Sequence, residues 1–381
     1  MNDITIDKTG WKKWRFDEVC RQVNTSSKDP VADGLEHVIG LEHIEPNNLH
    51  ITQWDTLEKE TTFTRKFRKG QVLFGRRRAY QRKVAYAEFD GICSGDILVF
   101  EAIEEVLLPE LLPFLIQSEG FFQKALATSA GSISPRTKFK ELADYEFLLP
   151  PKAEQKRLAE LLWAADEVVE KEKREREILQ NQIQIYINEN CNVMGQPKIP
   201  LSDLVDVNPT TKFDENEVSL ITMPDISEEG EILHQEKAVP SDYKNKGLTP
   251  FQENDILFAK ITPCMENGKG AIAKGLINGG GLGSTEFHVL RPKAASDLYF
   301  CYYLTMSKRF RKSAEKQMTG SAGQKRVQVE FFDFYKLHAP SKEDRKRIGD
   351  KLFEIDCSIS ALKQQISLSQ QIKQELINKI Y

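Results

Sequence analysis

Residues 150–166 read PPKAEQKRLAELLWAAD, and residues 340–356, which lie 190 positions further along the chain, read PSKEDRKRIGDKLFEID. Each stretch begins with a proline, continues with a cluster of basic and acidic residues, and then has apolar residues at helical spacing. A long internal repeat fixes the architecture of a chain before any single motif does. The two stretches therefore predict that one structural unit occurs twice.

The correspondence continues upstream of both stretches. Residues 128–131 (TSAG), Arg136 and Tyr145 match residues 320–323 (GSAG), Arg326 and Tyr335. Farther upstream, GQVLFGR around Phe74 resembles NDILFAK around Phe258 at an offset of 184, a drift that loop insertions explain. Each unit of about 190 residues reads as a globular part that ends in a long helix.

Length and composition limit the class of protein. A chain of 381 residues predicts two or three domains. A net charge of -4 and 40% hydrophobic residues indicate a folded, soluble protein and exclude a disordered tail or a uniformly basic coat. The six cysteines form no C-x-x-C pair, which favours reduced thiols over a zinc site or disulfides. We find no signal peptide or membrane span and expect a cytoplasmic protein.

The local patterns indicate α+β domains. Short β-rich runs lie at 38–44, 72–74, 84–87 and 97–100, with counterparts at 218–226, 256–258, 271–273 and 287–290. Each globule then has one helical stretch, at 109–127 and 297–318. Trp11, Trp14 and Phe16 are interpreted as core anchors. The predicted boundaries are 1–150 for the first globular domain, 151–195 for the central helix, 196–340 for the second domain and 341–381 for the C-terminal helix.

Two long helices are the strongest structural prediction. Residues 154–190 contain no glycine or proline and would extend about 55 Å. Residues 341–381 begin with a capping pair, Ser341 and Asp344, and would reach about 60 Å. The predicted coiled-coil seam consists of Leu158, Leu162, Ala165, Leu179, Ile183, Leu352, Ile355, Ile359, Leu362 and Ile366.

Two arrangements of these helices are open. Each helix could pack on its own globule as a core element, or the two could pack on each other. We favour mutual pairing, because a globule of this size has little room to cover so long a helix. The domain that connects the helices permits either polarity.

Charge is segregated along the chain. Between Glu60 and Glu88 there is no acidic residue, and the interval holds nine Lys and Arg residues that no acid opposes locally. Residues 84–123 reverse the sign, with eight acids and no Lys or Arg. Lys and Arg neutralise phosphates, Arg can pair with guanine and Gln with adenine. The basic segment therefore favours nucleic-acid binding.

Two further acid-free windows, 120–140 and 320–328, occupy equivalent places in the two units. Their small polar residues would let backbone amides approach phosphate oxygens. The candidate DNA contacts are Arg76, Arg77, Arg78, Tyr80, Gln81, Arg82, Lys83, Ser134, Arg136 and Lys138 in the first globule, and Lys260, Thr262, Lys269, Ser321, Gln324, Lys325 and Arg326 in the second. Related scaffolds with different contact loops would recognise two different half-sites.

With these motifs in this order, twice, the sequence resembles the specificity subunit of type I restriction-modification enzymes over almost its whole length. The segments FGRRRAYQRKVAYAEFDGICSGDILVF, GSISPRTKFKELADYEFLLPPKAEQKRLAELL and TGSAGQKRVQVEFFDFYKLHAPSKEDRKRIGDKL carry the resemblance. It implies two α/β target-recognition domains separated by an antiparallel coiled coil, in a pseudo-two-fold repeat. Each domain would bind half of an asymmetric, bipartite site in double-stranded DNA through the major groove.

The resemblance also implies partners. The helices would dock two DNA adenine methyltransferase subunits, which would carry S-adenosylmethionine, and motor and nuclease subunits, which use ATP and Mg, would join that core. The chain itself would bind no cofactor or metal and would not be an enzyme.

Two other function classes are open. Pro224-Asp225 with Asp242-Tyr243-Lys244 spells a PD…DxK pattern, which is typical of metal-dependent nucleases. A coiled-coil scaffold that binds only protein is the other, but it does not explain the recurring acid-free windows.

Overall fold

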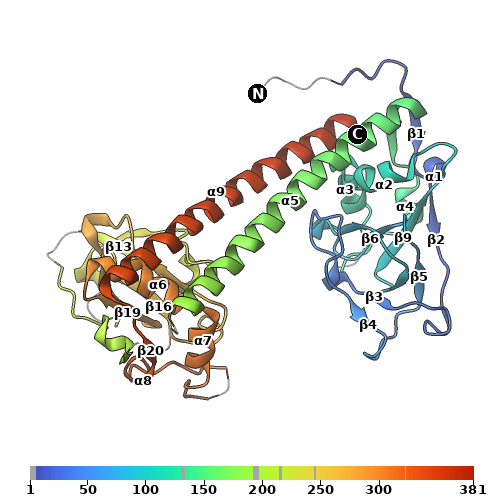
Figure 1. Cartoon of the computed structure of the whole chain (residues 1–381). Coiled ribbons are helices and arrows are strands. Elements are labelled where there is room, and N and C mark those ends of the chain that lie inside the picture. The colour runs from blue at the N-terminus through green and yellow to red at the C-terminus, as the bar shows by residue number, and fades with distance from the viewer. Residues whose placement is uncertain (1–5, 130–133, 192–196, 214–216, 244–245, 322) are drawn as a thin grey trace. The chain divides into compact units, whose positions relative to one another are not determined.

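The computed structural model describes residues 6–129, 134–191, 197–213, 217–243, 246–321 and 323–381. The chain forms two compact units, which Figure 1 shows with their labelled elements. Unit 1 comprises residues 1–172 and 365–381, and unit 2 comprises residues 173–364. Each unit therefore takes segments from both long helices.

Unit 1 contains two four-stranded sheets and a two-stranded ribbon. The first sheet has the order β2 (Cys20–Val23), β9 (Ile97–Ala102), β6 (Val72–Gly75) and β7 (Val84–Tyr86). The second has the order β4 (Asp55–Thr56), β3 (His37–Ile39), β8 (Gly91–Cys93) and β5 (Arg65–Phe67). The ribbon pairs β1 (Lys12–Arg15) with β10 (Glu146–Leu149). Strands β3 and β8 run parallel.

Unit 2 repeats this topology. Its first sheet has the order β12 (Val205–Val207), β19 (Phe287–Pro292), β16 (Ile256–Ala259) and β17 (Gly270–Ile272). Its second has the order β14 (Glu236–Ala238), β13 (Val218–Ile221), β18 (Gly280–Gly283) and β15 (Thr249–Gln252), and β13 and β18 run parallel. The ribbon pairs β11 (Lys198–Pro200) with β20 (Lys336–His338). The predicted repeat is thus confirmed at the level of strand order.

The single helical stretch expected in each globule is wrong, because each stretch forms two helices. They are α2 (Leu112–Gln117) and α3 (Glu119–Ala127) in unit 1, and α6 (Leu298–Met306) and α7 (Lys308–Glu315) in unit 2. Ser118 and Ser307 interrupt the stretches in extended backbone, and their hydroxyls accept hydrogen bonds from the Phe121 and Phe310 amides, both at 3.3 Å. Serine is a favoured N-cap, so each begins a new helix.

The β-rich runs predicted at 38–44 and 218–226 are too long. Strands β3 and β13 end at Ile39 and Ile221, and each is followed by a short 3₁₀ turn, η1 (Leu41–His43) and η5 (Met223–Asp225). In η5 the Asp225 carboxylate accepts a hydrogen bond from the Thr222 amide at 2.7 Å. Local side-chain bonds of this kind compete with strand pairing.

The remaining short elements connect the sheets. In unit 1 they are α1 (Phe16–Val19), η2 (Ala79–Gln81), η3 (Pro109–Leu111) and α4 (Phe139–Leu142). In unit 2 they are η4 (Leu201–Asp203), η6 (Pro240–Tyr243), η7 (Ile277–Gly279), η8 (Ala295–Asp297) and α8 (Phe331–Phe334).

The long helices α5 (Lys152–Asn190) and α9 (Lys342–Ile380) each have 39 residues, and their bounds differ by the 190 positions of the repeat. The Ser341 hydroxyl caps α9 by accepting the Asp344 amide at 3.1 Å, as the sequence predicted. In unit 1 the helices run antiparallel: Lys373 contacts Asp166 at 2.8 Å, and Gln365 contacts Glu172 at 2.7 Å.

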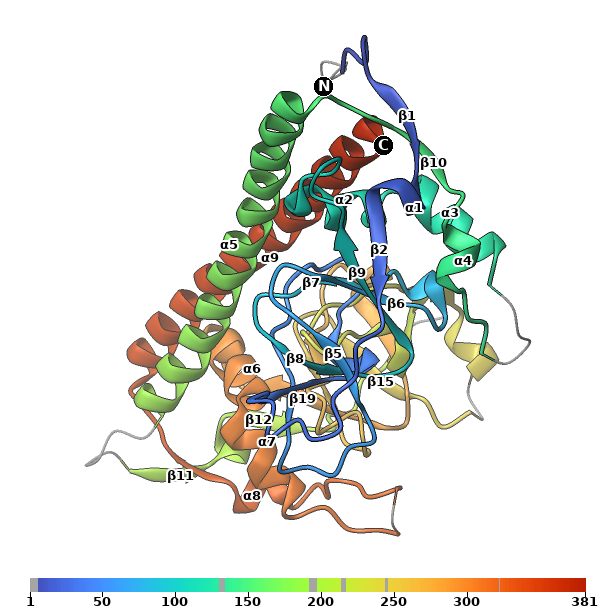
Figure 2. The same ribbon diagram turned by 90° about the vertical axis from the view of Figure 1, so that its right-hand side faces the viewer.

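Both helices enter the hydrophobic core of each unit. In unit 1, Leu158 and Leu162 of α5 share a buried cluster with Leu376, Ile377 and Ile380 of α9 and with the sheet residues. Figure 2 shows the C-terminal end of α9 beside α2, where the Gln374 amide donates to the Gln117 carbonyl at 3.1 Å. The two arrangements weighed from the sequence are therefore not alternatives, because in unit 1 each helix packs on the other and on the globule.

Unit 2 has the same construction. Ile183 and Ile187 of α5 share a buried cluster with Ile348, Leu352 and Ile359 of α9. Of the other predicted seam residues, Ala165 packs against the unit 1 core, Leu179 and Ile355 pack against the unit 2 core, Leu362 is half-buried and Ile366 is buried. The apolar residues of the two helices therefore form the contact between the helices and also part of the core of each unit.

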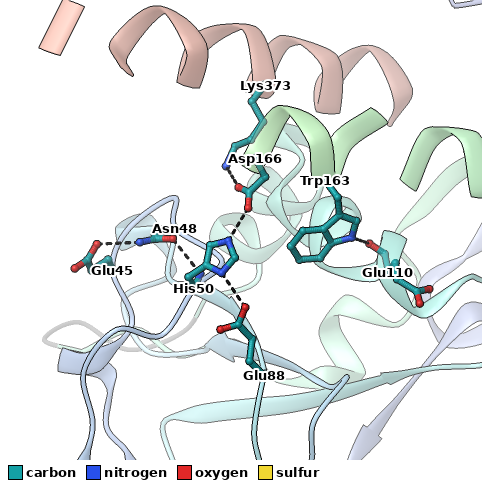
Figure 3. Close-up of polar contacts among 8 residues, drawn as sticks. All are labelled: Glu45, Asn48, His50, Glu88, Glu110, Trp163, Asp166 and Lys373. Carbon is teal, nitrogen blue, oxygen red and sulfur yellow. Dashed lines mark hydrogen bonds and ion pairs between the residues drawn. The ribbon is translucent and has the colours of Figure 1, made fainter. Parts of the chain in front are cut away.

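A polar cluster joins the globule of unit 1 to both helices (Figure 3). The His50 ring contacts Asp166 through Nε2 at 2.8 Å and Glu88 through Nδ1 at 3.0 Å. Asp166, which is 1% exposed, also accepts the ammonium of Lys373. The hydrogen bond to Asp166 is the main cause that raises the pKa of His50 above its ordinary value.

We predict that this cluster stabilises unit 1 more at pH 6 than at pH 9. Because the pKa of His50 is raised on folding, its contribution is full below the unfolded value of 6.5 and is lost as pH rises through the folded value. His50→Gln should cost about 1–3 kcal/mol near pH 6, since Asp166 loses a partner, and less near pH 9.

Urea unfolding of the wild type and the variant at each pH measures this difference. His234→Gln, at an exposed site in unit 2, is the matched control. A difference that stays constant or grows toward pH 9 would contradict the assignment.

Candidate nucleic-acid interface

In unit 1 the loop after β6 is held against residues 134–137 by backbone hydrogen bonds. The Arg78 amide donates to the Pro135 carbonyl at 2.8 Å, and the Thr137 amide donates to the Arg76 carbonyl at 3.1 Å. The Arg76 amide in turn donates to the carbonyl of Asp96 at 3.0 Å. The basic segment and the acid-free window, which are separate in the sequence, are therefore hydrogen-bonded to each other through residues 76–78 and 134–137.

The Asp96 carboxylate holds these two loops together through contacts with an arginine of each. It accepts Nε of Arg136 at 2.7 Å and lies 3.4 Å from Nη1 of Arg77. The hydrogen bond from Arg136 is the main cause that lowers the pKa of Asp96. We call residues 76–78 and 134–137 together with Asp96 the loop frame of unit 1.

Unit 2 has the same loop frame, made of residues 260–262, 324–327 and Glu286. The Thr262 amide donates to the Lys325 carbonyl at 3.0 Å, and the Val327 amide donates to the Lys260 carbonyl at 2.9 Å. Arg326 binds the Glu286 carboxylate with two hydrogen bonds, at 2.9 and 2.8 Å. Paired hydrogen bonds of this kind fix the orientation of the two side chains and strengthen the interaction between them.

Sequence reasoning missed Asp96 and Glu286. They lie 190 positions apart, as Arg136 and Arg326 do, and each follows a serine by two residues, directly before β9 or β19. That constant offset was a usable signal, because the acids and the arginines that they bind are displaced by the same 190 positions. The unit 2 loop also needs Gly320, because its backbone has a φ of +128° and a Cβ there would meet the Gln324 carbonyl at 2.8 Å.

The prediction that no acid opposes the basic segment is wrong, because folding brings acidic residues from other parts of the chain next to it. Arg82 binds Glu119 and lies 4.8 Å from the ring of Phe122, while Lys66 contacts Asp33 at 3.0 Å. Asp96 and Glu119 both come from the acidic stretch at 84–123. Much of the charge segregation is thus cancelled by folding.

Other predicted contacts also have partners within the chain. Lys83 donates to the Leu41 carbonyl at 2.6 Å, and Lys269 donates to the Met223 carbonyl at 3.0 Å. Ser134 accepts from Arg77 at 3.0 Å, and Thr262 donates to Glu266 at 2.7 Å. These side chains, with Arg77, Arg82, Arg136 and Arg326, hold the loops in place.

A second set of predicted contacts faces outward. Tyr80 is 58% exposed, and Arg76, Arg78 and Gln81 are half-buried around it. Nε of Arg76 is nevertheless buried and has no hydrogen-bond partner among the described residues, and burial together with the charge of Arg65 lowers the pKa of Arg76. The other outward residues are Lys138, Lys260, Ser321, Gln324 and Lys325, of which Lys260 is half-buried and the rest are exposed. Residues 130–133 and 322 of these windows lie outside the described residues.

The PD…DxK pattern gains no support. Asp225 closes the η5 turn through Thr222, Asp242 accepts a weak bond from Ser241 at 3.3 Å, and Lys244 lies outside the described residues. Within the described part of the chain, the group of three potential metal ligands is Glu42, His43 and Asp55. Nδ1 of His43 accepts the Gly40 amide there, so Nε2 carries the proton of the neutral ring.

The chain thus consists of two repeated α+β units with matching loop frames, each built around segments of both long helices. The model of the type I restriction modification DNA specificity domain matches residues 8–181 and 197–374. The chain belongs to this family.

Curated relatives match about half of the chain. It is 37% identical over 190 residues to the type I restriction enzyme EcoEI specificity subunit and 40% identical over 185 residues to the EcoAI specificity subunit, both of Escherichia coli. These matches cover 49% and 47% of this chain but only 32% and 31% of the relatives. The matched part thus spans about a third of each relative's length.

Solved structures show the same fold over the whole chain. The type I restriction-modification S subunit from M. genitalium aligns with a TM-score of 0.56 at 13% identity, covering 99% of this chain and 98% of that one. A chain from work on complex assembly and conformational transition of the type I R-M system aligns with a TM-score of 0.55 at 18% identity, covering 98% and 97%. No helix among the described residues combines the length and apolar character that crossing a membrane requires.

We predict that Asp96→Asn loosens the unit 1 loop frame without unfolding the protein. The ion pairs of Asp96 are partly exposed and contribute little to stability, but they hold the loops whose backbone bonds include the amides of Arg78 and Thr137. Hydrogen exchange at those two amides should accelerate, while the core strands stay protected.

Asp17→Asn, which removes an exposed partner of Arg15 in the same unit, is the matched control. Unchanged exchange at Arg78 and Thr137 in the Asp96 variant would show that backbone pairing alone holds the frame. Glu286→Gln tests the same point in unit 2.

Proposed function

We propose that this chain is the DNA-recognition subunit of a type I restriction-modification complex and reads a bipartite, asymmetric DNA site. Each unit would bind one half-site with the outward side chains of its loop frame. The observation that carries the proposal is that both units build the same loop frame but place different side chains on it. Two units with the same loop frame but different outward side chains suit a DNA site whose two halves differ in sequence.

The unit 1 surface has the chemistry of base and phosphate contact. Among the described residues the side chains of Arg76 and Arg78 form no hydrogen bond or ion pair, although Nε of Arg76 is buried, and Tyr80 and Gln81 follow closely in the sequence. A guanidinium can pair with guanine or neutralise a phosphate, and an amide can pair with adenine. The corresponding residues of unit 2 are Lys260 and Thr262, so fewer charges are available there.

The backbone at Arg78 supports a functional role. Its φ is 54°, in the left-handed region that residues other than glycine rarely adopt. The bond from its amide to Pro135 holds this conformation. Such strain is tolerated where it aims a functional side chain. Arg77 and Arg136, by contrast, would act as positioning residues through Asp96.

The long helices offer surface for partner subunits. On α5, Leu161 and Val168 are 47% and 50% exposed in unit 1, and Ile178 and Ile185 are 58% and 56% exposed in unit 2. Within each pair the residues are seven positions apart and so share one face. We assign these faces to docking of two methyltransferase subunits, which would supply S-adenosylmethionine, with ATP- and Mg-dependent subunits joining the assembly. This chain would contribute no catalytic residue.

Methylated adenines in genomic DNA test the function. Cells that express the chain with the methyltransferase encoded beside it should show a single split recognition sequence, and cells that lack the chain should lose that methylation. Methylation that persists unchanged without the chain would refute the proposal. Magnesium-dependent cutting by the purified chain would instead favour the nuclease alternative.

We predict that Arg78→Ala relaxes one base position in one half-site and weakens duplex binding by about 1–3 kcal/mol. The other half-site should keep its preference, because unit 2 is untouched. Titration of duplex DNA at fixed salt measures the affinity, since phosphate contacts make it depend on salt. Lys59→Ala, which removes an exposed cation of unit 1, is the control. Unchanged affinity and preference in Arg78→Ala would overturn this assignment.

A further inference from the structure

The repeat places the same acid twice in the two long helices. Because α5 and α9 are related by an offset of 190, Asp166 of α5 corresponds to Asp356 of α9. By the same offset, Lys373 of α9 corresponds to Ile183 of α5. The residue that pairs with the acid in unit 1 is therefore replaced by an apolar residue in unit 2.

In unit 1 the acid has its cations. Asp166 accepts Lys373 at 2.8 Å and His50 at 2.8 Å, as Figure 3 shows. Burial alone would raise the pKa of Asp166, but the bond from His50 and the charge of Lys373 outweigh it, so the pKa is lowered. A buried carboxylate is satisfied here by positive charges from within the chain.

In unit 2 the equivalent acid lacks such a partner. Asp356 accepts the Tyr303 hydroxyl at 2.9 Å, and within the described part of the chain no Lys, Arg or His forms an ion pair with it. The nearby Lys363 is bound instead by Glu229 and, at 2.9 Å, by Glu231. Burial raises the pKa of Asp356, the opposite direction from Asp166.

A cavity of about 690 Å³ lies at this point of unit 2. Asp356 and Ile183 both line it, together with Tyr302, Tyr303 and Ile359. Its size falls in the range of small-molecule sites, about 300–1,000 Å³. Ile183, which replaces the lysine of unit 1, therefore lies at the cavity wall, and Lys363 is the cation nearest to Asp356 there.

The charges around the cavity favour an organic cation. Its described lining includes six carboxylates and four cations; besides Asp356, the carboxylates are Glu228, Glu229, Glu231, Glu266 and Glu315. Of the cations, Arg311 is 5% exposed and donates to the carbonyls of Met265, Thr305 and Lys269 at 2.8 to 3.1 Å. Lys363 is paired with Glu229 and Glu231, which leaves Lys308 and Lys312. The carboxylates of the lining thus outnumber its cations.

We propose that this cavity binds an aliphatic polyamine. One ammonium group would lie on the Asp356 carboxylate, where Lys373 lies in unit 1, and further ammonium groups would meet the glutamates at the rim. The methylene chain would pack on the tyrosine rings and on Ile359. The inference does not rest on the proposed function, because it uses only the cavity and the comparison of the two units.

Calorimetric titration of the full chain with spermidine, in an amine-free buffer without DNA, tests the proposal. The wild type should bind one equivalent. Asp356→Asn should weaken binding at least about tenfold, because it removes a charge-assisted hydrogen bond. Ile183→Lys, which gives unit 2 the cation of unit 1, should weaken binding as strongly.

Phe334→Lys adds the same charge at a residue of unit 2 that is 73% exposed and outside the cavity lining, and it should leave the affinity unchanged. Circular dichroism checks the fold of each variant, and if Ile183→Lys is unfolded, Asp356→Asn decides. The proposal is overturned if the wild type does not bind spermidine, if all variants bind it equally, or if Mg²⁺ at matched ionic strength displaces it as well as putrescine does.

Discussion

The pairing of two apolar helix stripes within each core is the constraint on which the rest of the structure depends. Leu158 and Leu162 of α5 contact a cluster that also contains Leu376, Ile377 and Ile380 of α9, and the sheet residues of unit 1 close around all of them. In unit 2 the later part of α5, with Ile183 and Ile187, shares a core with the earlier part of α9, with Ile348 and Leu352. A helix that is apolar on one face must bury it, and here that face is shared between a partner helix and a sheet. The loop frames depend on this arrangement, because the sheets that carry them are part of the same cores.

The loop frames separate the residues that support the loops from the residues that face outward. Asp96 and Glu286 hold equivalent arginines, and the backbone bonds around them are the same in both units. The residues at 76, 78, 260 and 262 stand on that common support and differ in charge and shape. Contacts can therefore change without rebuilding the scaffold, since the supporting ion pair and amides lie on other residues.

The sequence predicted the architecture well because a repeat is a global signal. The offset of 190 located both long helices, and Ser341 located the start of α9 by a cap that the structure contains. Local breaks were harder to see. Ser118 and Ser307 each end one helix and begin another inside an apolar stretch, where composition alone favours continuity.

The candidate site was harder to predict for a physical reason. Periodicity reports which face is buried, but it does not report which charges meet after folding. Arg82 and Glu119, or Arg136 and Asp96, are about 40 residues apart in the chain, and only the fold brings them together. The predicted DNA contacts stay predictions, and the structure divides them into residues that hold the loops together and residues that face outward.

The composition of the unit 1 core has a consequence for biosynthesis. Its cluster includes Ile377 and Ile380, which the ribosome adds long after Leu158 and Leu162. At typical elongation rates, roughly 10–40 s separate the emergence of residue 172 from that of residue 377. During this interval the nascent chain carries Leu158 and Leu162 without their partners on α9, so the unit 1 core is completed only after Ile377 and Ile380 have emerged.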